Sequence, residues 1–353
     1  MSWNRFKWGE WMLVAGVDLG GTAVNYTLLN DREEFLIDGM CEHPARSTEG
    51  PKVCLQQIAD GLKMAVEKAG VSLADVAVVG LDTPGPASAT GVLSAKGSTN
   101  FVHSDWASFD MCGNLTKVLG KPVVYLNDAN AAAVWGHFAL FGSSKGTTSI
   151  SCIVGTGHGG GIIMDGSVIK GRKGFGGELG HVLIPFHMIP GIEGLKPECN
   201  CGRTGDLESL CSLTSIRKHL LPHFLKKYPD HELAKIEVPH KAAYRVRGMA
   251  EKGDPMCQGI FRVEARALGL FFDQMINTFD PDALIVGGGV VETSPEFQLW
   301  FMDEIRIGMG VQREEQADIP IHVMPNGDTA GARGAALEAL KFAQAADLAL
   351  ATS

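Results

Sequence analysis

Hydrophobic residues fall into short unbroken runs that alternate with longer segments in which they recur every three or four positions. Short runs bounded by turn residues predict buried strands, and the longer spacing predicts amphipathic helices. In 51–69, for example, Leu55, Ile58, Leu62 and Val66 would share one helix face. The expected strands are 13–18, 23–30, 76–81, 122–126, 147–154, 162–164, 167–170, 283–286 and 319–324, and the expected helices are 51–69, 111–119, 129–141, 207–219, 255–279 and 329–346.

The order of these elements predicts an α/β fold, because strands and helices alternate along most of the chain. A strand, a glycine turn and a second strand occur twice, at 13–30 and again at 147–164. This repeat, and the length of 353 residues, indicate two domains. We expect an N-terminal α/β domain at 1–127, completed by the helix at 329–349, and a larger C-terminal α/β domain at 128–328.

Charge and composition exclude several classes of protein. The chain has 31 Lys and Arg against 40 Asp and Glu, a net charge of −9, which argues against a general nucleic-acid binder. No apolar run approaches the roughly 20 residues of a membrane span, and Met1–Met12 lacks the apolar centre of a signal peptide. The eight cysteines are scattered except for Cys199 and Cys201, which predicts reduced thiols and a cytoplasmic location.

Glycine clusters at three predicted strand ends give the first chemical signal. Glycine lets backbone N–H groups approach an anion closely, so three such turns favour a nucleotide phosphate chain, although any one alone is most simply a tight turn. Asp18 beside the first turn is placed to hold Mg²⁺, directly or through water, or to cap its own turn. The clusters are Gly20-Gly21-Thr22, Gly155-Thr156-Gly157 within 155–161, and Gly287-Gly288-Gly289.

The second cluster also matches the dinucleotide fingerprint G-x-G-x-x-G, through Gly155, Gly157 and Gly160. Glu178 lies about 20 residues further on, as that fingerprint requires. The fingerprint also needs a helix after the glycines, whose N-terminus meets the pyrophosphate. Residues 162–169 instead predict a hairpin, so a nicotinamide-dependent dehydrogenase is disfavoured.

Six motifs occur in a fixed order along the chain: Asp18–Thr22, Thr83–Pro86, Asn127–Ala133, Gly155–Gly161, Gly176–His181 and Cys199–Gly202. Together they resemble the ROK family (repressor, open reading frame, kinase), in particular its bacterial glucokinase-type sugar kinases. The resemblance extends from about Val14 to Ala336. It implies a two-domain actin-like ATPase fold, also called ribonuclease H-like, with ATP and sugar in a cleft between the domains.

The resemblance implies ATP-dependent phosphorylation of a hexose, most simply glucose to glucose 6-phosphate. Asp128, between a predicted strand and a predicted helix, would be the base toward the sugar 6-hydroxyl; by itself this position also suits a helix N-cap. Gly287, Gly288 and Gly289 would lie beside the adenosine, with the two earlier glycine turns on the phosphates and Mg²⁺ held by Asp18 through water. The implied sugar ligands are Gly85, Asn100, Asn127, Asp128, Glu178, His181 and Glu208.

A zinc site is suggested by Cys199 and Cys201 with His181 upstream. The family pattern is Cys-x-Cys-Gly-x-x-Gly-Cys-x-Glu, and this chain has Asp206 in place of the third cysteine. Zinc accepts carboxylate oxygen, so a site of His181, Cys199, Cys201 and Asp206 is one interpretation. Cys211 and His187 are other candidates for the fourth ligand, and the alternative is that zinc is lost and the loop packs without it.

Two other functions remain open at this point. The same ligand set would serve a kinase for mannose, fructose, N-acetylmannosamine or N-acetylglucosamine. A non-catalytic sugar-sensing ROK protein is the other alternative, but family repressors carry a helix-turn-helix, and only about a dozen residues precede the first strand here. The resemblance also implies a homodimer or homotetramer.

Overall fold

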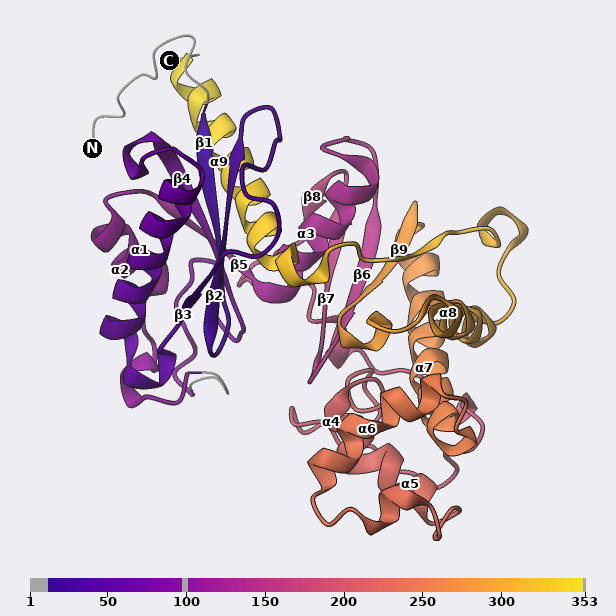
Figure 1. Ribbon diagram of the computed structural model, residues 1–353. Coiled ribbons are helices and arrows are strands. Elements are labelled where there is room, and N and C mark those ends of the chain that lie inside the picture. Colours follow the sequence, from indigo (N-terminus) through magenta and orange to yellow (C-terminus); the bar gives the residue numbers. More distant parts are fainter. Residues whose placement is uncertain (1–11, 97–100, 352–353) are drawn as a thin grey trace. The chain divides into compact units, whose positions relative to one another are not determined.

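The computed structural model describes residues 12–96 and 101–351, which form two compact units, each with its own five-stranded sheet (Figure 1). Unit 1 takes the chain up to Gly142, the segment Ser167–Gly176 and the chain from Asn326 onward. Unit 2 takes Ser143–Gly166 and Gly177–Pro325. Unit 1 is therefore assembled from segments that lie far apart in the sequence.

The sheet of unit 1 has the strand order β3-β2-β1-β4-β5. β1 pairs antiparallel with β2 and parallel with β4, and β4 pairs parallel with β5. The elements of this unit are β1 (Leu13–Leu19), β2 (Ala23–Asn30), β3 (Glu42–Pro44), α1 (Pro51–Lys68), β4 (Val76–Thr83), α2 (Met111–Leu119), β5 (Val123–Asn127), α3 (Asp128–Phe141) and α9 (Ala330–Ala351).

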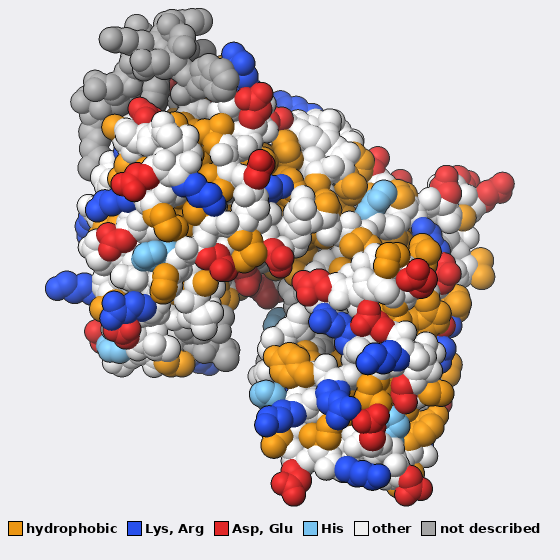
Figure 2. Space-filling model, viewed as in Figure 1, with side chains coloured by type: hydrophobic (Ala, Val, Ile, Leu, Met, Phe, Trp, Pro, Cys, Tyr) orange, Lys and Arg blue, Asp and Glu red, His pale blue; other side chains and the backbone are white. Residues whose placement is uncertain are grey.

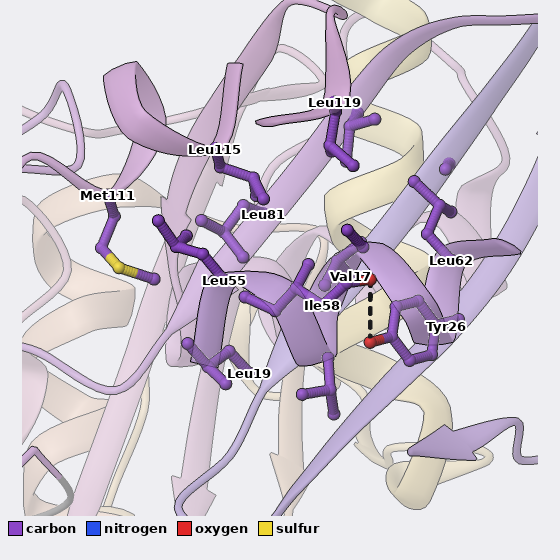
Figure 3. Close-up of a cluster of buried hydrophobic side chains, with 14 of the residues drawn as sticks. Val17, Leu19, Tyr26, Leu55, Ile58, Leu62, Leu81, Met111, Leu115 and Leu119 are labelled. Atoms are coloured by element: carbon purple, nitrogen blue, oxygen red, sulfur yellow. Dashed lines mark hydrogen bonds between the residues drawn. The ribbon is translucent and has the colours of Figure 1, made fainter. Parts of the chain in front are cut away.

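One face of this sheet carries the hydrophobic core that α1 and α2 cover. Alternate residues of β1, including Val17 and Leu19, point into this core, as the two-residue period of a strand requires. The four α1 residues expected to share a face, Leu55 to Val66, all belong to the same cluster. Figure 3 shows Tyr26 between the sheet and α1, where its hydroxyl donates to the carbonyl oxygen of Ile58 at 3.3 Å.

The other face of the sheet packs against the alanine-rich helix α9. Gly16 in β1 and Gly80 in β4 lie so close to this helix that a Cβ on either would overlap the carbonyl oxygens of Ala332 and Ala335. Backbone therefore packs directly on backbone here. α3 also packs against α9, and unit 1 extends to Gly142, past the domain boundary expected before Asp128.

The sheet of unit 2 has the strand order β10-β9-β6-β7-β8, with β6 antiparallel to β7 and parallel to β9. α7 and α8 pack against each other through Phe261, Phe297 and Phe301. The elements are β6 (Ser149–Val154), β7 (His158–Met164), α4 (Leu213–Ser215), α5 (Leu221–Leu225), α6 (Pro239–Glu251), α7 (Pro255–Phe279), β9 (Ala283–Gly287), α8 (Pro295–Met309) and β10 (Ile321–Val323). The short strand β8 (Ser167–Val168) lies in the segment Ser167–Gly176, which belongs to unit 1.

Two expectations for unit 2 were wrong, and two helices were missed. The helix expected at 207–219 begins only at Leu213, because the residues before it form a turn in which Ser209 Oγ donates to the carbonyl oxygen of Asp206 at 2.7 Å. Gly159, Gly160 and Gly161 belong to strand β7 rather than to the preceding turn. Helices α6 and α8 were not expected at all.

Lys and Arg side chains are intermixed with Asp and Glu over the face of each unit that Figure 2 shows. This agrees with the modest net charge of −9. Within the described ranges, none of the helices has the length and apolar character needed to pass through a bilayer.

Candidate active site

Three aspartates gather where the parallel strands of unit 1 end. Asp18 of β1 is paired in register with Asp82 of β4, and Asp128 directly follows β5. Parallel strands end at the same edge of a sheet, which is where ligands of α/β folds usually bind. Asp18 and Asp128 were expected to be site residues, whereas Asp82 was not among the expected site residues. Its position after an apolar strand was the available signal.

Asp82 is the most deeply buried member of this group, with 0% of its surface exposed. Neither of its carboxylate oxygens has a hydrogen-bonding partner among the described residues apart from the neighbouring carboxyl of Asp18. Burial, and then the charges of Asp18 and Asp128, raise the pKa of Asp82 well above its usual value. Burial also raises the pKa of Asp18, against the opposing hydrogen bond with Asp82. This sheet edge is therefore poised to take up positive charge.

Asp128 is the first residue of α3 rather than its N-cap. The cap is Asn127, whose Oδ1 accepts from the Asn130 N–H at 3.1 Å. The Asp128 carboxylate accepts from the Ala129 N–H at 2.8 Å and is half-buried. The helix N-terminus favours its charged form, because the backbone dipoles place partial positive charge there.

The first glycine turn is held by its neighbours. The Gly20 N–H donates to the carbonyl oxygen of Ala23 at 3.0 Å, and Ser47 Oγ donates to that of Gly21 at 2.8 Å. The side chain of Thr22 is exposed. The turn next to Asp18 thus consists of backbone groups and one exposed hydroxyl, that of Thr22.

Of the two other sugar ligands expected in unit 1, Gly85 and Asn100, the structure describes only Gly85. Gly85 lies beside Asn127, since a Cβ on Gly85 would be 3.5 Å from Asn127 Nδ2. Asn100 lies outside the described residues. The geometry therefore brings together Gly85, Asn127 and Asp128.

The glycine turn of unit 2 joins β6 to β7 and is tied to the start of α4. The Leu213 N–H donates to the carbonyl oxygen of Gly155 at 2.9 Å, and the Thr214 N–H donates to that of Thr156 at 3.1 Å. β7 begins at His158, directly after the turn, so no helix follows the glycines. The rejection of a dinucleotide fingerprint is confirmed.

A cavity of about 300 Å³ opens beside this turn within unit 2. Gly155 and Thr156 line it together with Gly289, so two of the expected glycine motifs meet at one cavity. Gly288 has a φ of 82°, and a Cβ there would overlap the carbonyl oxygen of Val154. Only glycine suits that position. The walls are mostly apolar and include Leu213, Ile216, Ala243, Phe261 and Val290.

Glu178, His181 and Glu208 lie close enough for their charges to influence one another. The pKa of Glu178 is raised, first by partial desolvation and also by the charge of Glu208, while His181 opposes the shift. Glu208 Oε2 accepts from the His158 N–H at 3.0 Å. A Cβ on Gly157 would lie only 2.8 Å from that same oxygen, so glycine admits the carboxylate to the turn.

Four potential metal ligands form a second cluster next to Glu208. One atom each of His181, Cys199, Cys201 and Asp206 lies within 4.8 Å of all the others. Cys199 Sγ also donates to Glu208 Oε1 at 3.4 Å. Among the described residues, neither Cys211 nor His187 belongs to this cluster, so the alternative fourth ligands are not supported.

Asp206 is hydrogen-bonded to the other three members of the cluster and is 0% exposed. Burial alone would raise its pKa, but hydrogen bonds from Cys199, the Ser209 N–H, Cys201 and His181 outweigh burial and lower it. The pKa of the Cys199 thiol is raised by desolvation. All eight cysteines are free thiols, so no disulfide competes for these sulfurs.

Known proteins resemble this chain along most of its length. A glucokinase from Thermotoga maritima is 31% identical over 281 residues, which are 78% of this chain and 81% of the relative. An N-acetylmannosamine kinase from Vibrio cholerae is 30% identical over 280 residues, 79% of this chain and 84% of the relative.

Solved structures also resemble this chain along most of its length. A ROK hexokinase from Thermus thermophilus superposes with a TM-score of 0.74 at 27% identity, covering 94% of this chain and 99% of that one. A ROK glucokinase from Streptomyces griseus, in complex with glucose and AMPPNP, gives a TM-score of 0.68 at 26% identity, covering 93% and 99%.

These neighbours are ROK sugar kinases, which have the actin-like ATPase fold, so the expected fold class is confirmed. The profile of the ROK family matches residues 14–341. Two α/β units, ordered motifs at their strand ends and this match together show that the chain belongs to the ROK family.

Proposed function

We propose that this protein is an ATP-dependent hexose kinase that converts glucose to glucose 6-phosphate. The observation that carries the proposal is the half-buried carboxylate of Asp128, held at the N-terminus of α3 beside Asn127 and the expected sugar wall at Gly85. A protein that only binds a sugar does not need a base at the acceptor hydroxyl. Kinase relatives on two sugars support the reaction, and the two glucokinases favour glucose.

Asp128 acts as the proton acceptor. The sugar 6-hydroxyl oxygen forms a bond to the γ-phosphorus of ATP while the bond from that phosphorus to the β–γ bridging oxygen breaks and ADP leaves. The hydroxyl proton passes to Asp128. Phosphoryl transfer is largely dissociative, so the proton moves late and orientation of the hydroxyl matters most.

The other residues hold the two substrates. The sugar hydroxyls bind to Asn127, Glu178, His181 and Glu208, since carboxylates accept from neighbouring hydroxyls and imidazole can accept or donate. The adenosine occupies the cavity of unit 2, beside Gly287–Gly289, and the turns at 20–22 and 155–157 bind phosphates through backbone N–H groups.

Asp18 would hold Mg²⁺ through water. The buried carboxyl of Asp82 beside it has no cationic partner among the described residues, so this strand edge fits a divalent cation. When bound, Mg²⁺ neutralises phosphate charge, which this chain needs because Lys and Arg are sparse in its motifs.

We also propose a structural zinc ion held by His181, Cys199, Cys201 and Asp206. The donor set fits, because two sulfurs, one imidazole nitrogen and one carboxylate oxygen supply the four ligands of a closed site. The ion would fix His181 and the loop that presents Glu208. It takes no part in the proton transfer.

The test is a coupled ADP-release assay with ATP and Mg²⁺ over glucose, mannose, fructose, N-acetylmannosamine and N-acetylglucosamine. We expect the highest kcat/KM with glucose. A higher value with another hexose would overturn the choice of glucose and keep the kinase. Turnover with none of them, together with a sugar-dependent rise in Tm, would overturn the kinase and favour a sugar sensor.

A further inference from the structure

The geometry points to Glu264 as the residue that recognises the nucleotide base: its carboxyl group donates a hydrogen bond to a ring nitrogen of a purine. This inference rests on the proposed function, which places the adenosine in the cavity of unit 2. It adds a specificity-determining residue that none of the sequence motifs contains.

Glu264 lies in the middle of α7 and is among the residues that line the cavity. It is only 1% exposed. The Ser212 N–H donates to its carboxyl group, and the other oxygen, Oε1, has no hydrogen-bonding partner among the described residues. A buried polar atom left in this state typically costs about 1–3 kcal/mol, so a partner supplied by a ligand would recover that free energy.

A second buried glutamate shows what a purely structural role looks like in the same unit. Glu304 of α8 pairs with Arg262 Nε at 3.0 Å and with Arg266 Nη2 at 2.6 Å. Both arginines lie on α7, so Glu304 ties two helices together. Glu264 is on the same helix α7 but faces the cavity, and the structure shows no ion pair for it among the described residues.

The carboxyl group of Glu264 is protonated at neutral pH in the empty cavity. Burial raises its pKa to about 8, against the opposing hydrogen bond from Ser212. With one oxygen accepting from the Ser212 N–H, the Oε1 hydroxyl is the group that remains to donate. Purine ring nitrogens are acceptors, so the two groups are complementary.

The rest of the cavity fits a flat heteroaromatic base. Leu213, Ile216, Phe261 and Val290 offer apolar walls, and a few polar groups among them are the usual design of a specific small-molecule pocket. Besides Glu264, the polar side chains that line this cavity are Thr156, Tyr244, Arg247 and Glu292. Gly155 lines the same cavity, so a base that reaches Glu264 leaves the phosphates near the glycine turn. A site that buries a donor rejects ligands that leave the donor unpaired.

The test combines two variants with altered nucleotides, and binding is measured by calorimetry on the full chain. Glu264→Met removes the donor at similar volume, and Glu264→Gln keeps a donor. We expect Glu264→Met to weaken ADP binding at least tenfold and Glu264→Gln to stay within about threefold of wild type. Glucose affinity should be unchanged in both, which serves as the control for folding.

Analogues of ADP identify the acceptor atom without relying on the variants alone. Among 1-deaza-, 3-deaza- and 7-deaza-ADP, one should bind the wild-type protein about tenfold more weakly than ADP, and that loss should vanish in Glu264→Met. Equal binding of all three to the wild type, or ADP binding that is indifferent to Glu264→Met, would overturn the inference alone. If the wild-type protein binds no ADP, the proposed nucleotide site falls as well.

Discussion

The two units use the same hairpin for different chemistry. β1 and β2 form an antiparallel pair with β4 parallel on the other side, and β6 and β7 form an antiparallel pair with β9 parallel on the other side. In unit 1 the strand ends present carboxylates. In unit 2 they present glycine backbone and an apolar cavity. The shared scaffold supplies positions, and the residues at the strand ends decide which group of a substrate each unit can hold.

Two fully buried aspartates, one in each unit, show how the surroundings of a carboxyl group differ between the units. Asp82 and Asp206 are each 0% exposed. The pKa of Asp82 is raised by burial and by two neighbouring carboxylates, whereas four hydrogen bonds lower that of Asp206 despite burial. Burial alone therefore does not decide whether a carboxyl group is charged; the donors around it do.

The largest expected effect tests the catalytic side of the comparison. Asp128→Asn removes the proton acceptor and keeps the shape of the side chain. We expect kcat to fall by about 10²–10⁴-fold with sugar binding nearly unchanged, because a general base contributes in that range. Steady-state kinetics and glucose titration give the two values. A kcat within a few-fold of wild type would contradict the role of Asp128.

Neutralising each buried aspartate should have opposite effects on stability. Asp206→Asn loses the hydrogen bonds to a charged group, and we expect it to lower the free energy of unfolding by about 3 kcal/mol at pH 7. Asp82→Asn removes a buried carboxyl group that has no cationic partner among the described residues, and it should raise the free energy of unfolding by about 1 kcal/mol or more at pH 8. Denaturant unfolding of the zinc-free protein, without nucleotide or added Mg²⁺, measures both.

The directions of the two pKa shifts predict how the stability of these two variants depends on pH. The folded-state pKa of Asp82 is raised, so wild-type stability falls as pH rises from about 4 toward that value, and the advantage of Asp82→Asn should grow over the same range. The folded-state pKa of Asp206 is lowered, so its contribution is lost in acid and the deficit of Asp206→Asn should shrink there. If both variants changed the free energy of unfolding in the same direction, the contrast between Asp82 and Asp206 would be wrong.

Backbone contact in unit 1 predicts a strong response to a single methyl group. Gly80→Ala drives a Cβ into the Ala335 carbonyl, and we expect a loss of about 1–3 kcal/mol in the free energy of unfolding. Gly248→Ala in α6 is the matched control, because a Cβ there meets nothing within 4 Å. Helix propensity should make that control about 0.5–1 kcal/mol more stable. If Gly80→Ala lost no more stability than Gly248→Ala, the contact between α9 and the sheet would be loose.

The smallest effect concerns sugar binding in unit 2. Glu178→Gln replaces a charged acceptor by a neutral one, and we expect the glucose KM to rise about three- to tenfold with kcat little changed. Glu178→Asp, which keeps the charge, should show whether reach or charge is lost. An unchanged KM in Glu178→Gln would place this residue outside the sugar site.

Local patterns predicted the elements with strong periodicity. The helix expected at 255–279 is α7 with the same bounds, and the β1–β2 hairpin is confirmed. α6 was missed because Pro239 and several charged residues hide a short apolar stripe. The turn before Leu213 was taken for helix because its hydrophobic spacing is helical, whereas Asp206 and Ser209 bond to each other instead.

Candidate site residues could be predicted where they lie in a sequence motif. They were missed where only the fold brings them together. Asp18, Asp128 and the four proposed zinc ligands lie in or beside sequence motifs. Asp82 is significant only because strand pairing sets it opposite Asp18. Glu264 lies within a helix of ordinary pattern, and no local signal indicates that its side chain lines a cavity whose other walls include residues of 154–156, 213–247 and 289–292.

The position of α9 has a consequence for synthesis. Unit 2 and the rest of the chain up to residue 329 must leave the ribosome before this helix exists, although β1 and β4 emerge early. At about 5–20 residues per second, the nascent sheet waits roughly ten to forty seconds with Gly16 and Gly80 uncovered. During that interval the face of the sheet that α9 covers in the folded protein is open to solvent.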